Sequence, residues 1–147
     1  MKVLVAYDGT LQAKDALKYG VEKVKENGGE VVALHVFNSN QYIDYDVFGA
    51  EEAGRAASMR FVSEAKKILE ETGKGIRTRV IVQEGNPEEE TINYARENNV
   101  DLLLCSPGYK KIISSFRMLF GDKGTAVPEY TGLNKTEEPA VYVVSQR

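Results

Sequence analysis

The sequence predicts an α/β protein built on one doubly wound, five-stranded parallel sheet with helices on both faces. Short apolar runs rich in β-branched residues alternate with segments of helical period along the 147 residues. The strand-like runs are almost continuously apolar, as expected for parallel strands that helices cover on both sides. The length suits a single domain over residues 1–147 with a core of its own.

The first half of the chain opens with an expected strand, Lys2–Tyr7. Apolar residues then recur on one helical face from Ala13 to Val24, with Thr10 as the N-cap and Gly28 at the end. Glu30–Phe37 is the second expected strand. A strand, a helix and a second strand in this order predict a parallel pair joined by a helical crossover.

Residues 38–49 show neither a helical nor a strand period and are expected to form a long loop. Loops of this length in compact domains are usually functional or unstructured. Tyr42, Tyr45 and Phe48 are either a lid or partner contact, or a loop that folds back onto its own domain. The residues alone leave both interpretations open.

The middle of the chain repeats the same alternation. A long helix is expected over Ala53–Leu69 with its end near Gly73, followed by a third strand, Ile76–Gln83. Asn86 at an N-cap position and Pro87 at the first helical position then begin another helix. The acids that follow favour the positive end of that helix.

The last third holds two more expected strands, Asp101–Cys105 and Pro139–Ser145. Between them, apolar residues recur at helical spacing over Ile112–Phe120, which predicts a short amphipathic helix of the core or of a dimer surface. This completes five strands. In a doubly wound sheet the ligand crevice lies beyond the carboxyl ends of the strands, where the winding reverses.

Composition excludes several classes of function. A net charge of −3 provides no basic field for nucleic acid or anionic lipid. One cysteine and one histidine exclude a disulfide framework and a clustered zinc site. The first residues lack the long apolar segment of a signal peptide or membrane anchor, so a cytoplasmic protein is expected.

Two side chains invite a catalytic interpretation and have simpler ones. His35, inside an apolar strand, is expected to be a packed, hydrogen-bonded residue. Cys105 ends a strand beside a turn, but a nucleophilic thiol needs a nearby base or positive field, so a buried structural cysteine is expected. No catalytic residue is assigned.

Four segments carry a family resemblance in their order and spacing. They are Val3–Thr10, Ala33–Val36, Glu84–Pro87 and Asp101–Ser106, and together they resemble the universal stress protein family over nearly the whole chain. The resemblance implies the strand order 3-2-1-4-5. It also implies a homodimer formed by antiparallel pairing of the last strands, here Ala140–Val144.

Members of that family that bind ATP carry a glycine pattern after the fourth strand: Gly, two residues, Gly, nine residues, then Gly followed by Ser or Thr. Here Cys105 stands at the first glycine and Gly108 at the second, while Met118 stands where the third is expected. Gly124-Thr125 completes the pattern only with six inserted residues, where its amide and hydroxyl could begin a helix and bind an anion.

The resemblance also implies a site for an adenine nucleotide. Asp8 would lie near the ribose or a phosphate-bound Mg²⁺, and the backbone at Val36 would contact adenine; no other metal ligand is expected. Asp8 can equally cap the turn or helix that follows it. The residues assigned to the site are Asp8, Gly9, Thr10, Val36, Ser106, Gly108, Gly124 and Thr125.

Two functions follow from these observations. The first is a noncatalytic regulatory or stress-response protein with a degenerate adenine-nucleotide crevice. The alternative is a functional ATP-binding member with slow ATPase activity or a nucleotide-dependent switch. Phosphoryl transfer needs a positioned base or a cationic clamp, and the expected cradle offers only Lys110, Lys111 and Lys123. This favours the first function.

Overall fold

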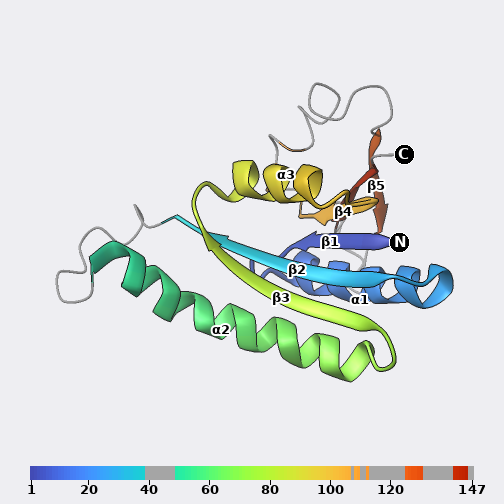
Figure 1. The fold of residues 1–147 in the computed structure, drawn as a ribbon, viewed down its shortest axis with the longest axis horizontal. Helices are drawn as coiled ribbons and strands as arrows, with labels where there is room; N and C mark the ends of the chain where they lie inside the picture. Colours follow the sequence, from blue (N-terminus) through green and yellow to red (C-terminus); the bar gives the residue numbers. More distant parts are fainter. Residues whose placement is uncertain (39–48, 107, 110–111, 113–124, 131–140, 146–147) are drawn as a thin grey trace.

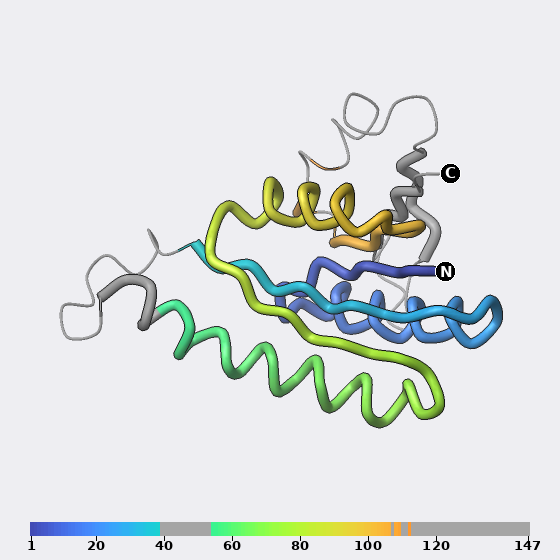
Figure 2. Tube along the Cα trace, viewed as in Figure 1, coloured from blue at the N-terminus to red at the C-terminus, as the bar shows by residue number. Residues whose placement is uncertain are grey.

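A computed structural model describes residues 1–38, 49–106, 108–109, 112, 125–130 and 141–145 (Figure 1 and Figure 2). Four parallel strands form the centre of its sheet in the order β3-β2-β1-β4. Their bounds are β1 Lys2–Ala6, β2 Glu30–Phe37, β3 Arg77–Glu84 and β4 Leu102–Cys105. The α/β class and the order of the first four predicted strands are therefore confirmed.

Three helices connect these strands: α1 Leu11–Asn27, α2 Gly49–Thr72 and α3 Pro87–Glu97. Figure 1 shows α1 and α2 on one face of the sheet and α3 on the other, as double winding requires. The predicted N-caps are confirmed, because the Thr10 side chain accepts from Ala13 N–H and the Asn86 side chain accepts from two amides of α3.

The period-two alternation of the strands divides the core into two clusters. Val3 and Val5 of β1 pack with α1 and α2, whereas Leu4 and Ala6 pack with α3. All four side chains are fully buried. Burying an aliphatic side chain of this kind stabilises the fold by about 1.5–3 kcal/mol, so both faces hold the sheet in place.

The sheet continues beyond β4 in a way that differs from the prediction. The last strand, β6 (Val141–Ser145), lies beside β4 as expected but runs antiparallel to it. A further strand, β5 (Thr125–Tyr130), pairs antiparallel with β6 at the edge of the sheet. The prediction of five parallel strands is wrong in this region. Only ten residues, 131–140, separate β5 from β6, too few for a parallel crossover, so these two strands run antiparallel to each other.

This order changes the expected dimer contact. β6 lies between β4 and β5, so both of its edges are already hydrogen-bonded. Over its described residues, Val141–Val144, the strand predicted to pair two copies through Ala140–Val144 therefore has no free edge in this structure. Residues 39–48, and Ile112–Phe120 apart from Ile112, lie outside the described residues.

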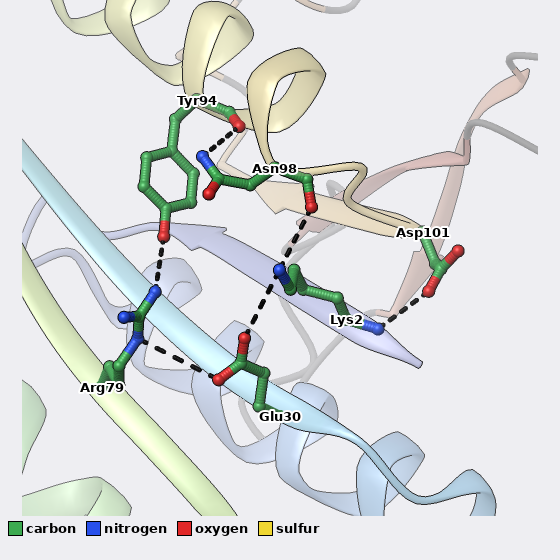
Figure 3. Close-up of polar contacts among 6 residues, drawn as sticks. All are labelled: Lys2, Glu30, Arg79, Tyr94, Asn98 and Asp101. Carbon is green, nitrogen blue, oxygen red and sulfur yellow. Dashed lines mark hydrogen bonds and ion pairs between the residues drawn. The ribbon is translucent and has the colours of Figure 1, made fainter.

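A polar network at the amino ends of the strands fixes the end of α3 (Figure 3). Lys2 Nζ donates to the carbonyl of Asn98 at 3.2 Å and lies 3.6 Å from Glu30. Arg79 donates to the Tyr94 hydroxyl at 2.9 Å. A cation at the carboxyl end of a helix is favourable, so β1 and β3 together hold α3 against the sheet. Within the described residues, no helix combines the length and apolarity needed to cross a bilayer.

Candidate functional site

Asp8 joins the two loops that follow β1 and β4. Its Oδ1 accepts hydrogen bonds from the amide of Thr10 at 3.1 Å and from the hydroxyl of Thr10 at 2.6 Å. Its Oδ2 accepts from the hydroxyl of Ser106 at 3.1 Å, across 98 positions of sequence. Bonds to an ionised acceptor are stronger than neutral ones, so this carboxylate holds the two loops at one end of the sheet.

The sequence suggests two roles for Asp8, a cap for the following turn and a residue of the ligand crevice, and its position is compatible with both. Its bonds to Thr10 form the turn that begins α1, which confirms the capping interpretation. Its bond to Ser106 lies at the predicted crevice, where parallel β1 and β4 both end. The structure thus brings together Asp8, Thr10 and Ser106.

Gly9 is required by packing. Its φ is +79°, a left-handed value, and a Cβ added there would lie 2.3 Å from the Phe61 ring of α2. The close approach is therefore to a helix of the core, and the glycine needs no ligand to explain it. The crevice loop therefore packs at Gly9 against the Phe61 ring of α2.

His35 is hydrogen-bonded to the backbone just before the same loop. Its Nδ1 lies 2.9 Å from the carbonyl oxygen of Tyr7, which can only accept, so Nδ1 carries the hydrogen. Its Nε2 lies 3.1 Å from Ser58 Oγ, and its ring centroid lies 4.8 Å from that of Phe61. The interpretation of His35 as a packed, hydrogen-bonded residue is confirmed. It fixes the backbone one residue before Asp8.

A cavity of about 250 Å³ lies at this edge of the sheet. Three segments form its walls: the loop after β1, the first turn of α3 and the turn after β4. Its lining residues are Asp8, Asn86, Pro87, Glu88, Gly108 and Tyr109. The cavity occupies the switch point at which the sequence predicts a crevice.

The charged residues of the described cavity lining, Asp8 and Glu88, are both acidic. The pKa of the Cys105 thiol is raised to about 12, chiefly by burial and then by the charges of Glu88 and Asp8. The pKa of the Tyr109 hydroxyl is also raised, first by burial and then by Asp8. Cys105 is therefore a neutral buried thiol near neutral pH, as predicted. The described residues contain no group of three metal-ligating side chains.

Gly108 differs from Gly9 because the fold does not require it. Its φ lies outside the left-handed range, and among the described residues an added Cβ would meet only Ser106 Oγ, at an ordinary 3.6 Å. Gly108 is exposed and lines the cavity. Its small size keeps the cavity open without contributing a turn that only glycine can form.

Two other predicted site residues lie elsewhere. Val36 is buried in the cluster on the α3 face and does not line the cavity. Thr125 begins a strand, not the helix that was predicted for it. It pairs with Ser145, which pairs with Leu102 at the amino end of β4, so the sheet places it away from Ser106. Gly124 lies outside the described residues.

Sequence reasoning missed Glu88 and Tyr109 as lining residues. The acids Glu88–Glu90 are predicted to stabilise the positive end of the α3 dipole. Consecutive helical residues point in different directions, so the run is not expected to form a common site. The available signal was Asn86: an N-cap directly after the third strand places the next residues at the carboxyl edge of the sheet.

A larger hollow of about 550 Å³ lies at the opposite, amino edge of the sheet. Lys2, Glu30 and Arg77 contribute charges of both signs to its walls, and Lys2 and Glu30 lie 3.6 Å apart. Like the cavity at the carboxyl edge, it is open to solvent. Ligands of doubly wound sheets bind beyond the carboxyl ends of the strands, whereas this hollow lies at their amino ends.

Fold and site together define a doubly wound α/β protein with a polar crevice at the switch point of its sheet. The model of the universal stress protein family matches residues 1–113, and the chain belongs to that family. The universal stress protein YxiE of Bacillus subtilis is 30% identical over 129 residues, which cover 82% of this chain and 86% of that protein. A universal stress protein of Methanocaldococcus jannaschii is 25% identical over 107 residues, which cover 70% of this chain and 62% of that protein. The chain thus spans less than two thirds of this second relative.

Solved structures agree on the fold. A protein of the universal stress protein family from Burkholderia pseudomallei matches with a TM-score of 0.61 at 19% identity. The match covers 78% of this chain and 88% of the Burkholderia chain. The universal stress protein UspA from Lactobacillus plantarum has a TM-score of 0.60 at 17% identity and covers 72% of this chain and 76% of that chain. At these identities the likeness establishes the α/β architecture alone.

Proposed function

We propose that this chain is a noncatalytic regulatory protein of the stress response that binds an adenine nucleotide in the crevice at the carboxyl edge of its sheet. One observation carries the proposal: Asp8 ties the β1 loop to Ser106 of the β4 loop beside a cavity of about 250 Å³. Crevices of doubly wound sheets bind ligands where these loops meet. Asp8, Thr10, Ser106 and Gly108 are the predicted residues that remain at this place.

The chemistry of the described residues favours binding over catalysis. Phosphoryl transfer needs a base or a cation aimed at the reacting group. The described lining of the cavity contributes no lysine or arginine, and Asp8 already accepts three hydrogen bonds. The Cys105 thiol is buried and neutral, and His35 bonds to a backbone carbonyl away from the lining. A role in signalling the nucleotide state is the function that these groups support.

The cellular setting belongs to the proposal too. We place the protein in the cytoplasm as a single domain that senses adenine nucleotide, with Mg²⁺ arriving on the nucleotide phosphates. The support is its family membership and an acidic, low-cysteine composition.

Thermal unfolding with and without 5 mM Mg-ATP, roughly a saturating level for a site of 50 μM dissociation constant, tests the proposal. A ligand at 100 times its dissociation constant stabilises the native state by about 2.7 kcal/mol. Ser106→Ala should reduce the shift, because it removes the hydroxyl that fixes Asp8. Ser63→Ala, on the exposed surface of α2, is the matched control and should retain the shift.

Absence of any shift for the unsubstituted protein with ATP, ADP or adenosine contradicts the proposal. Phosphate release measured on the same samples separates a binder from a slow ATPase. The proposal predicts no release above the protein-free rate. Release that Ser106→Ala abolishes would replace it with the enzymatic alternative.

A further inference from the structure

The carboxylate of Glu88 closes one side of the crevice. Its Oε2 accepts a hydrogen bond from the backbone amide of Ile112 at 3.1 Å, linking the first turn of α3 to the segment after β4 across 24 positions. Glu88 also lines the cavity, and Ile112 is fully buried in the cluster on the α3 face. This bond is therefore made at the wall of the cavity.

An amide that binds a carboxylate oxygen can also bind a phosphate oxygen, because both are anionic acceptors of backbone N–H groups. In this chain the Ile112 amide already has such an acceptor from within the protein. Glu88 thus stands where an oxygen of a bound anion could stand.

Asp8 adds a second negative charge to the same space. Glu88 and Asp8 both line the cavity, and the charges of both raise the pKa of the Cys105 thiol and of the Tyr109 hydroxyl. Among the described lining residues, a polyphosphate without a counter-ion would meet two like charges, whereas a neutral nucleoside carries no charge for them to repel.

We propose that Glu88 determines specificity in this crevice as an internal acidic competitor. It holds the Ile112 amide and repels phosphate groups, so the crevice prefers adenosine, or a nucleotide whose phosphates carry a divalent cation, over the free polyphosphate anion. The inference rests on the proposed function, since it concerns the ligand of the same site.

The substitution Glu88→Gln separates charge from hydrogen bonding. Glutamine retains an oxygen that accepts from the Ile112 amide and removes the negative charge. Glu88→Ala removes both and frees the amide. Glu89→Gln is the matched control: Glu89 is the exposed neighbour on α3 and does not line the cavity, and its replacement changes the net charge by the same amount.

Calorimetric titration of the full chain with ATP and with adenosine, in EDTA at 0.15 M salt, tests the inference. Glu88→Gln should bind ATP at least tenfold more tightly than the unsubstituted protein, while adenosine affinity changes less than twofold. Glu88→Ala should gain at least as much, and Glu89→Gln should change neither. With excess Mg²⁺ the gain of Glu88→Gln should shrink, because the cation neutralises the phosphates.

Two results overturn the inference. If Glu88→Gln binds ATP with unchanged affinity, or gains equally for adenosine, Glu88 does not discriminate by charge and the proposed function stands. If no variant binds either ligand, the proposed function fails and the inference fails with it. Circular dichroism of each variant confirms that the fold is retained, and either of the two Glu88 variants suffices for the comparison.

Discussion

Replacing Gly9 with alanine perturbs the loop that carries Asp8 at its closest contact with α2. An L-residue at φ +79° costs about 1–2 kcal/mol. The added Cβ would also lie 2.3 Å from Phe61, and forcing such an overlap in a packed region costs about 1–3 kcal/mol. The free energy of unfolding should therefore fall by about 2–5 kcal/mol.

Gly75→Ala is the matched control, because Gly75 has a similar φ of +87° and nothing within 4 Å of an added Cβ. It should cost only the backbone part, about 1–2 kcal/mol. Any gain from restricting the unfolded chain is the same for both glycines and cancels in the difference. Gly9→Ala should thus be the less stable variant by about 1–3 kcal/mol.

Urea unfolding of both variants measures this difference, and thermal unfolding checks it at about 2–4 °C per kcal/mol. The double variant Gly9→Ala with Phe61→Leu removes the ring and should recover part of the loss relative to the sum of the single changes. Equal losses for Gly9→Ala and Gly75→Ala, together with strict additivity in the double variant, would refute the contact between the crevice loop and α2.

Three further predictions follow from the site and the network at the opposite edge. Gly108→Val should change the free energy of unfolding by no more than about 0.5 kcal/mol, since among the described residues an added Cβ meets only Ser106 Oγ at an ordinary 3.6 Å, but it should abolish nucleotide binding measured by calorimetry. A destabilised variant, or one that binds normally, counts against the assignment. The pKa of Cys105 is raised from 9.0 to about 12, so stability should fall as the pH rises, because the thiol of the unfolded chain ionises first. Between pH 9 and 10.5 the free energy of unfolding in urea should fall by about 1–2 kcal/mol more for the unsubstituted protein than for Cys105→Ala. Parallel curves of this free energy against pH for the two proteins would contradict the prediction. Lys2→Met should lower the free energy of unfolding by about 0.3–1 kcal/mol, because it removes the cation from the end of α3. The loss should be smaller at 1 M salt, and a loss that does not depend on salt would contradict this explanation.

The sequence predicts most of the central sheet well because β1, β2 and β4 are buried and almost entirely apolar. Their short length favours strands over buried helices. β5 was missed because Pro128 lies within it, and a proline argues against a central strand. Proline is tolerated on an edge strand, and the edge position of β5 follows only from the order of the whole sheet.

The crevice was predicted more reliably than its lining. Topology alone places Asp8 and Ser106 at one switch point, and the structure joins them by a hydrogen bond. Glu88 and Tyr109 could not be found in the same way. The contact of Glu88 with Ile112 depends on where the first turn of α3 meets the segment after β4, and no local spacing encodes that meeting.

The most direct measurement for the central claim is a nuclear magnetic resonance titration of the 16.3 kDa chain with Mg-ATP, following backbone amides. Binding in the crevice predicts chemical-shift changes that concentrate at Ser106, Gly108 and Tyr109 and saturate together. The amides of Lys2 and Arg77 at the amino edge should stay unchanged. Spectra without changes at saturating ligand, or changes confined to the amino edge, would contradict the claim that the carboxyl-edge crevice binds an adenine nucleotide.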